Sequence, residues 1–199
     1  MMKGLWSRLQ GLSNVNFDFK GPLPSNTRNT YLLVVVDEYS RFPFCFPCPN
    51  MLTSTVIKFL DQLFALCGMP NYVHSDLGRS FISQERKDYF LRRGGASSQC
   101  TPYHPTGNAQ VERYNGALWQ TVRLCLKSQR LPVESWESVL PDVLHASRSS
   151  CTTTNATPHE LFFGFHRRSP SGKTLPSWLL RSGPVFLKNM RVPVNMTMW

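Results

Sequence analysis

Three carboxylates are placed where they could share one reaction. Asp18 lies near the end of one strand-like segment, Asp76 ends another, and Glu112 lies on a helical segment. Strand ends are where sites form in layered α/β sheets. Clustered carboxylates are costly to desolvate unless cations offset their charge, and Mg²⁺ prefers oxygen ligands. Two such ions about 4 Å apart can activate an attacking oxygen and stabilise the leaving oxygen of a phosphodiester. Asp18, Asp76 and Glu112 are therefore predicted to hold two Mg²⁺ or Mn²⁺ ions.

The two aspartates belong to a predicted sheet. Residues 14–19 alternate apolar and polar side chains, and the β-branched and aromatic runs at 31–40 and 41–47 follow closely. Because parallel neighbours need long crossovers, these three strands are expected to form an antiparallel meander. Two further strands are predicted at 71–76 and Ala96–Cys100, which makes five in all.

Helices alternate with the later strands. Thr53–Cys67 repeats apolar residues at helical spacing and is followed by Gly68, which ends it. The other predicted helices cover 83–93, Gly107–Lys127 and 134–149, with a short last helix that begins near Pro158. On Gly107–Lys127 a stripe toward the core is formed by Val111, Tyr114, Leu118, Val122 and Cys125, with Glu112 off it. The pattern predicts an α/β fold with a mixed sheet flanked by helices.

The charge balance favours a polyanionic partner. The chain has 22 Lys and Arg against 12 Asp and Glu, a formal charge of +10 and a sequence pI near 9.7. Nucleic acid is the first candidate, and a ribosomal-type or merely soluble basic protein is the alternative that charge alone leaves open. Residues 12–165 are predicted to form one core, and the acid-free stretch 166–199 a basic, extended tail.

The six cysteines do not have the dense spacing of a secreted disulfide scaffold. Cys45 and Cys48 form a CxxC, but no second Cys or His pair follows at zinc-finger distance, so structural zinc is the lesser alternative. No apolar run approaches the roughly 20 residues that cross a bilayer, and the first residues lack a signal-peptide core. We expect an intracellular protein without a membrane partner.

Several blocks of sequence together resemble one family. They are FDFKGPLP (17–24), YLLVVVDEYSRF (31–42), HSDLGRSF (74–81), TPYHPTGNAQVERYNG (101–116) and TPHELFFG (157–164). Through these blocks residues 14 to 165 resemble the catalytic core of retroviral and gypsy-type retrotransposon integrases. Between Asp76 and Glu112 stand 35 residues, the separation for which the D,D-35-E signature of that family is named.

The resemblance implies a ribonuclease-H-like fold that brings the two aspartate-bearing strands side by side. It implies an enzyme, a metal-dependent endonuclease and strand transferase, in which Asp18, Asp76 and Glu112 are the catalytic metal ligands. DNA would be the substrate, at least a dimer the assembly, and the nucleus the place of action on chromosomal DNA. Asp37, within VDEYSR, would have a structural role.

Six further residues near these blocks are candidate DNA contacts: Lys20, His104, Asn108, Gln110, Arg113 and Asn115. By helical spacing Asn108, Glu112, Asn115 and Trp119 share one face. Asn108 and Asn115 are therefore expected to face the DNA.

Two alternatives remain open at the level of sequence. A truncated or domesticated integrase fragment would bind nucleic acid without catalysis. We expect neither the zinc-binding nor the β domain that flank the core in this family within these 199 residues, which favours the fragment, whereas the intact carboxylate triad favours the enzyme. A ribonuclease H shares the fold, but the 35-residue spacing and the GNAQVERYNG block fit an integrase better.

Overall fold

A computed structural model describes most of the predicted core. The described residues are 12, 14–75, 84–93, 96–99, 106–151, 155–165 and 167. At 75, 84–87, 96–99 and 106–110 the backbone alone is described. Of the predicted tail at 166–199 only Arg167 falls among the described residues, so the division into core and tail stays a prediction.

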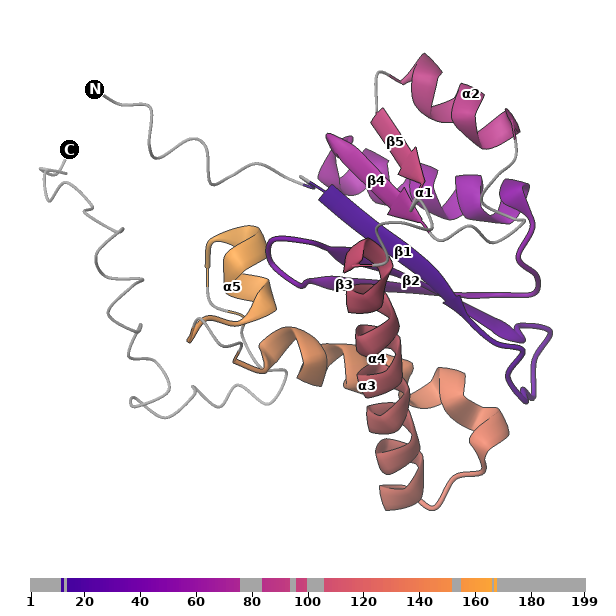
Figure 1. Cartoon of the computed structure of the whole chain (residues 1–199). Coiled ribbons are helices and arrows are strands. Elements are labelled where there is room, and N and C mark those ends of the chain that lie inside the picture. The colour runs from indigo at the N-terminus through magenta and orange to yellow at the C-terminus, as the bar shows by residue number, and fades with distance from the viewer. Residues whose placement is uncertain are drawn as a thin grey trace, which may run out of the picture.

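A five-stranded mixed sheet forms the centre of the molecule, as predicted (Figure 1). Its strands are β1 (Asn14–Lys20), β2 (Tyr31–Asp37), β3 (Pro43–Cys48), β4 (Tyr72–Ser75) and β5 (Ala96–Gln99), in the spatial order β3-β2-β1-β4-β5. The first three strands pair antiparallel, which confirms the meander, and β4 pairs parallel with both β1 and β5. The strands that carry Asp18 and precede Asp76 are therefore neighbours.

One face of the sheet is covered by α1 (Thr53–Cys67) and α2 (Gln84–Arg92). Alternate residues of β1 and β2, namely Val15, Phe17, Leu33 and Val35, enter this core with the buried side of α1. The end of α1 is as predicted, because Gly68 has a φ of 83° that other residues rarely adopt, and its N–H donates to the carbonyl of Phe64.

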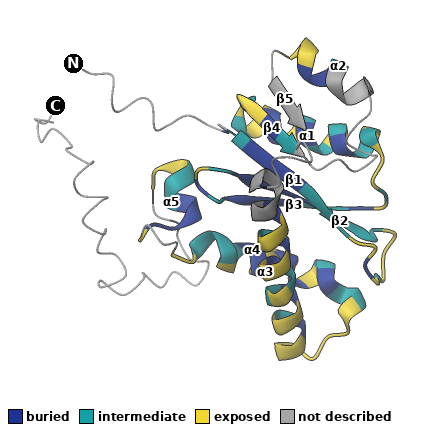
Figure 2. Ribbon diagram, viewed as in Figure 1, coloured by how far each residue is buried: buried dark blue, intermediate teal, exposed yellow. Residues whose placement is uncertain are grey.

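The other face is covered by α3 (Thr106–Ser128) and α4 (Trp136–Ser149). The opposite set of β2 side chains, Leu32, Val34 and Val36, packs here against these two helices. Figure 2 shows the centre of the sheet and the inner sides of the helices buried, while the outer side of α3 is exposed from Glu112 onward. Because side chains alternate along a strand, Asp18 on β1 belongs to the α3 side, opposite to Phe17.

Two predicted elements are shorter or more irregular in the structure. The segment 31–40 leaves the strand after Asp37, because the side chain of Asp37 accepts hydrogen bonds from Ser40 and fixes a turn. The helix predicted at 134–149 begins as a 3-10 turn, Val133–Ser135, before α4. The last helix, α5 (Pro158–Phe163), begins with a capping box between Thr157 and Glu160.

None of the helices in the described part of the chain is both long and apolar enough to span a membrane.

Candidate functional site

Asp18 is held at the end of β1 by two hydrogen bonds. Its Oδ1 accepts from the backbone N–H of Phe19 at 2.8 Å, and its Oδ2 accepts from Nδ2 of Asn115 at 2.7 Å. The residue is half-buried, on the side of the sheet that α3 crosses. The carboxylate is therefore oriented by its own strand and by α3 before any ligand binds.

Asn115 was expected to face the DNA, but in the structure its side chain is buried. It is 5% exposed, and its amide is directed at Asp18. The expectation failed because Asn115 follows Val111 by four residues and precedes Leu118 by three, which places it on the buried stripe itself. Trp119, expected on the same DNA-facing side, packs edge-on against the buried Trp136 at 6.2 Å between ring centroids. The spacing of Asn115 from Val111 and Leu118 was therefore the signal in the sequence that Asn115 packs inward, where it can position Asp18.

Glu112 lies on the exposed part of α3, one turn before the helix contacts Asp18 through Asn115. Its neighbour Val111 is buried, so the helix is fixed against the sheet while Glu112 faces outward as predicted. Because α3 packs across β1, β2 and β4, it brings Glu112 to the same region of the molecule as Asp18.

The third predicted carboxylate, Asp76, lies outside the described residues. The strand before it is described, and its register aligns Phe17 of β1 with Ser75 of β4. The residues that follow these two in sequence are Asp18 and Asp76. The parallel pairing of β1 with β4 is the geometry that an aspartate pair at one sheet edge requires.

The other five candidate DNA contacts divide into three groups. Arg113 is exposed on α3 beside Glu112, and Lys20 is half-buried at the last position of β1. Asn108 and Gln110 lie in the first turns of α3, where the backbone alone is described. His104 lies outside the described residues.

The carboxylates that are described fit a hard divalent cation by chemistry. Asp18 and Glu112 offer oxygen donors, which Mg²⁺ and Mn²⁺ prefer over the thiolates of zinc sites. Within the described residues no group of three His, Cys, Asp or Glu side chains is arranged to hold a metal, and the expected third ligand, Asp76, is not among them.

Asp37 is buried and closes the turn that joins β2 to β3. Its Oδ2 accepts from the backbone N–H of Ser40 at 2.8 Å and from the Ser40 hydroxyl at 2.6 Å. The Ser40 hydroxyl in turn accepts from the N–H of Phe42 at 3.1 Å. This arrangement agrees with the structural role expected for Asp37.

Cys45 and Cys48 face opposite sides of the sheet. Cys45 packs against the α3 and α4 core, whereas Cys48 is buried in the α1 and α2 core. Residues three apart on a strand point in opposite directions, so this CxxC cannot close around one metal ion. Burial raises the pKa of the Cys45 thiol to about 12 and that of Cys48 to about 11. Both thiols therefore remain protonated at neutral pH.

Comparison with known proteins identifies the family to which these features belong. Residues 14–105 match the family model described as "Integrase core domain". Relatives occur in viral polyproteins. The Pro-Pol polyprotein of simian foamy virus type 1 is 33% identical over 154 residues, which cover 77% of this chain and 13% of the polyprotein. That of feline foamy virus is 30% identical over 176 residues, which cover 87% of this chain and 15% of the polyprotein.

The Gag-Pol polyprotein of koala retrovirus is 29% identical over 149 residues, which cover 74% of this chain and 9% of the polyprotein. The chain thus spans a small part of these relatives.

The fold is also found among solved structures. A chain of the simian T-cell lymphotropic virus intasome, in a cryo-EM structure with the PP2A regulatory subunit B56 gamma, superposes with a TM-score of 0.66 and 22% sequence identity. The match covers 84% of this chain and 58% of that chain. It supports the α/β, ribonuclease-H-like fold predicted from the sequence.

Proposed function

Because this chain carries an integrase core domain of the retroviral type, we propose that it is a metal-dependent polynucleotidyl transferase that cuts and joins DNA. Its catalytic residues are Asp18, Asp76 and Glu112, and its ions are two Mg²⁺ or Mn²⁺.

The observation that carries this proposal is the arrangement of Asp18. Its strand pairs in parallel with the strand that precedes Asp76, and its carboxylate is tied to α3, the helix of Glu112. Segments far apart in the sequence thus meet near the end of β1, the central strand of the sheet.

The residues of this chain have separable tasks in such a reaction. Asp18 and Glu112 provide anionic oxygen donors, and Asn115 fixes the direction of the Asp18 carboxylate. Divalent ions, when bound, would activate the attacking oxygen and stabilise the leaving oxygen of a phosphodiester. Arg113, exposed beside Glu112, is placed to contact a DNA phosphate.

A strand-resolution assay tests the proposal. The full chain is incubated with Mn²⁺ and a preassembled branched DNA, and the rejoined strand is measured for wild type, Asp18→Asn and Glu112→Gln. We expect product from the wild type and none above background from either variant, while a matched exposed change on α4, Asp142→Asn, leaves the yield unchanged. Absence of product from a folded, DNA-binding wild type would instead favour the non-catalytic fragment.

The assembly and the place of action follow as parts of the same proposal. Joining two element ends requires two active sites, so we propose at least a dimer on DNA, acting in the nucleus on chromosomal DNA. Sedimentation with and without DNA, together with imaging of the tagged chain, tests these two points.

A further inference from the structure

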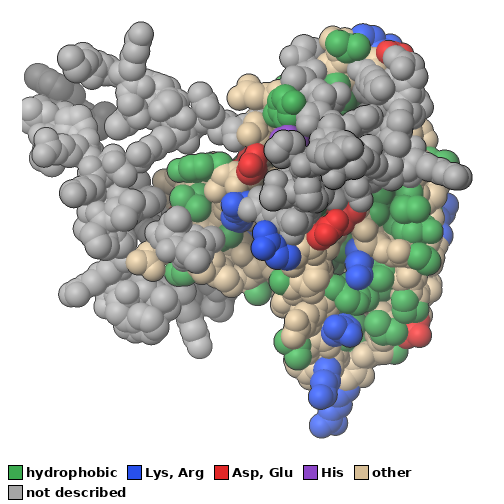
Figure 3. All heavy atoms as spheres, viewed as in Figure 1, with side chains coloured by type: hydrophobic (Ala, Val, Ile, Leu, Met, Phe, Trp, Pro, Cys, Tyr) green, Lys and Arg blue, Asp and Glu red, His purple; other side chains and the backbone are tan. Residues whose placement is uncertain are grey.

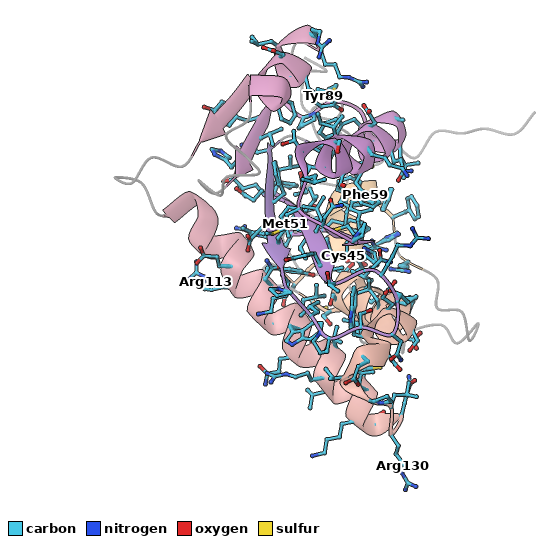
Figure 4. All side chains as sticks on the ribbon, turned by 90° about the vertical axis from the view of Figure 1, so that its right-hand side faces the viewer. Cys45, Met51, Phe59, Tyr89, Arg113 and Arg130 are labelled. Atoms are coloured by element: carbon cyan, nitrogen blue, oxygen red, sulfur yellow. The ribbon has the colours of Figure 1, made fainter. Side chains whose placement is uncertain are left out.

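The exposed side of α3 carries a row of cations that begins beside Glu112. The four basic residues are Arg113, Arg123, Lys127 and Arg130, the last of which lies two residues after the end of the helix. In Figure 3 Lys and Arg side chains follow one another down the column of α3. Figure 4 shows Arg113 toward the start of the helix and Arg130 at its far end. We call these four residues the basic row.

The row results from the helical register. Arg113 and Lys127 are fourteen residues apart, and Arg123 lies four before Lys127, so all three lie on one side of the helix. The opposite side of α3, with Val122 and Leu126, is buried against the sheet and α4. Packing of the helix therefore forces these cations outward.

The stretch of sequence that follows Glu112 carries only positive charges. After Glu112 the next acidic residue in the sequence is Glu134, so the stretch between them carries four cations and no anion. Within the described part of the chain, no ion pair is formed by Arg123, Lys127 or Arg130. The exposed positions between Arg113 and Arg123 include Gly116, beside which a Cβ would meet nothing within 4 Å. The backbone of a binding partner can therefore approach the helix closely at Gly116.

The macrodipole of α3 explains only part of the basic row. Cations near the end of a helix are stabilised by its macrodipole, which accounts for Lys127 and Arg130. The effect of the dipole falls off within one turn of a helix end, so it does not explain Arg113 or Arg123, which lie more than one turn from either end of α3.

We propose that the basic row binds the phosphates of the DNA duplex arm that extends away from the reacting phosphodiester. The occupant is duplex DNA because a linear row of cations matches a backbone of regularly spaced negative charges. The inference rests on the proposed function, which places the reacting phosphodiester near Asp18 and Glu112. It adds a second region that contacts DNA, and the length of that region determines how many base pairs of duplex the protein binds.

The helix sets the length of that arm. From Glu112 to Lys127 the axis of α3 rises about 22 Å, at about 1.5 Å per residue. At about 3.4 Å per base pair this corresponds to about six or seven base pairs. Arms shorter than this should not reach Lys127, whereas longer arms should.

The test compares two double variants of equal charge change. Arg123→Gln with Lys127→Gln removes the far half of the row, and Lys58→Gln with Arg92→Gln removes two exposed cations from α1 and α2 on the other face of the sheet. Binding to metal-free branched DNA is measured by fluorescence anisotropy, with arms of about 4 to 14 base pairs and about 50 to 200 mM salt. Because the readout is binding, it is independent of whether the chain catalyses any reaction.

We expect the row variant to bind long arms more weakly than wild type, with the slope of log affinity against log salt shallower by about 1.8, or about 0.9 per lost phosphate contact. On arms below about six base pairs it should match wild type. The control variant should match wild type at every length. Equal loss at all arm lengths, or equal loss in the control, would overturn the proposal, as would unchanged binding of a row variant whose thermal unfolding is like that of wild type.

Discussion

Asn115 determines the direction of the Asp18 carboxylate. Its Nδ2 donates to Oδ2 of Asp18 at 2.7 Å, while Oδ1 of Asp18 is occupied by the N–H of Phe19. Residues that orient a metal-binding carboxylate from behind commonly have a large effect on metal affinity although they do not touch the ion.

We therefore expect Asn115→Ala to reduce the Mn²⁺ affinity and the yield of strand resolution by about 10- to 100-fold. The free energy of unfolding should fall by only about 0.5–1.5 kcal/mol, because one hydrogen bond is lost. Titration calorimetry and thermal unfolding separate the two effects. Gln120→Ala, an exposed change on the same helix, is the matched control. Unchanged metal affinity in the Asn115 variant would remove Asn115 from the site.

The cysteines differ in reactivity for reasons of burial. Cys45 and Cys48 have pKa values raised from 9.0 to about 12 and about 11, mainly by desolvation. Cys151 is exposed. At pH 9 about one thousandth of Cys45 would be thiolate, and the thiolate is the form that alkylating agents attack.

We expect iodoacetamide at pH 9 to label Cys151 first and to leave Cys45 and Cys48 unmodified in the folded protein, as read by peptide mass spectrometry. Since the folded state keeps both thiols protonated, their contribution to stability is complete below pH 9 and is lost as pH rises through 11 to 12. Rapid labelling of Cys45 in the native protein would contradict the raised pKa of its thiol.

At the scale of elements, Arg148 joins α4 to the edge strand β3. Its Nε and Nη2 donate to the carbonyl of Pro43 at 3.1 and 2.8 Å, and its guanidinium lies 4.6 Å from the centroid of the Phe42 ring. Phe42 in turn stacks on Phe162 of α5 at 4.9 Å. The guanidinium thus holds α4 to β3 and, through Phe42, contacts the cluster that includes α5.

Arg148→Lys should therefore destabilise the fold almost as much as Arg148→Met, by about 1–3 kcal/mol, because an ammonium cannot donate in this forked geometry or stack on a ring. Urea unfolding of both variants checks this. Retention of full stability by the lysine variant would show that charge alone matters at this position.

The elements themselves were largely predictable because their signals are local. The bounds of α1 follow from its apolar spacing and from Gly68, and β1 follows from its alternation of apolar and polar residues. Asn115 was misplaced because helical spacing defines a face without showing what covers it. In the structure, Asp18 of β1 and the side chain of Trp136 cover that face.

The pairing of β1 with β4 has a different origin. Nothing in the local sequence of either strand specifies that they are neighbours, since the partner strands are separated by β2, β3 and α1. The resemblance to integrases supplied that expectation, and the register of Phe17 with Ser75 confirms the pairing. The placement of Asp76 itself remains a prediction.

For the whole molecule, the two faces of the sheet have different tasks. The α1 and α2 face contributes core packing and an ion pair between Arg93 and Asp61 at 2.7 Å. The α3 and α4 face carries Asp18, Glu112 and the basic row. The carboxylates proposed to carry out the reaction and the cations proposed to hold DNA thus lie on the same side of the sheet.

The central claim is that Asp18 and Glu112 belong to one divalent-metal site. The most direct measurement is a calorimetric titration of the full chain with Mn²⁺, comparing wild type with Glu112→Gln and with Glu134→Gln, the same substitution on the 3-10 turn before α4. We expect saturable binding by wild type and by the Glu134 variant, and binding at least about tenfold weaker when Glu112 loses its charge, because an anionic oxygen ligand is removed while the shape is kept. Equal Mn²⁺ affinity in all three proteins would contradict the assignment.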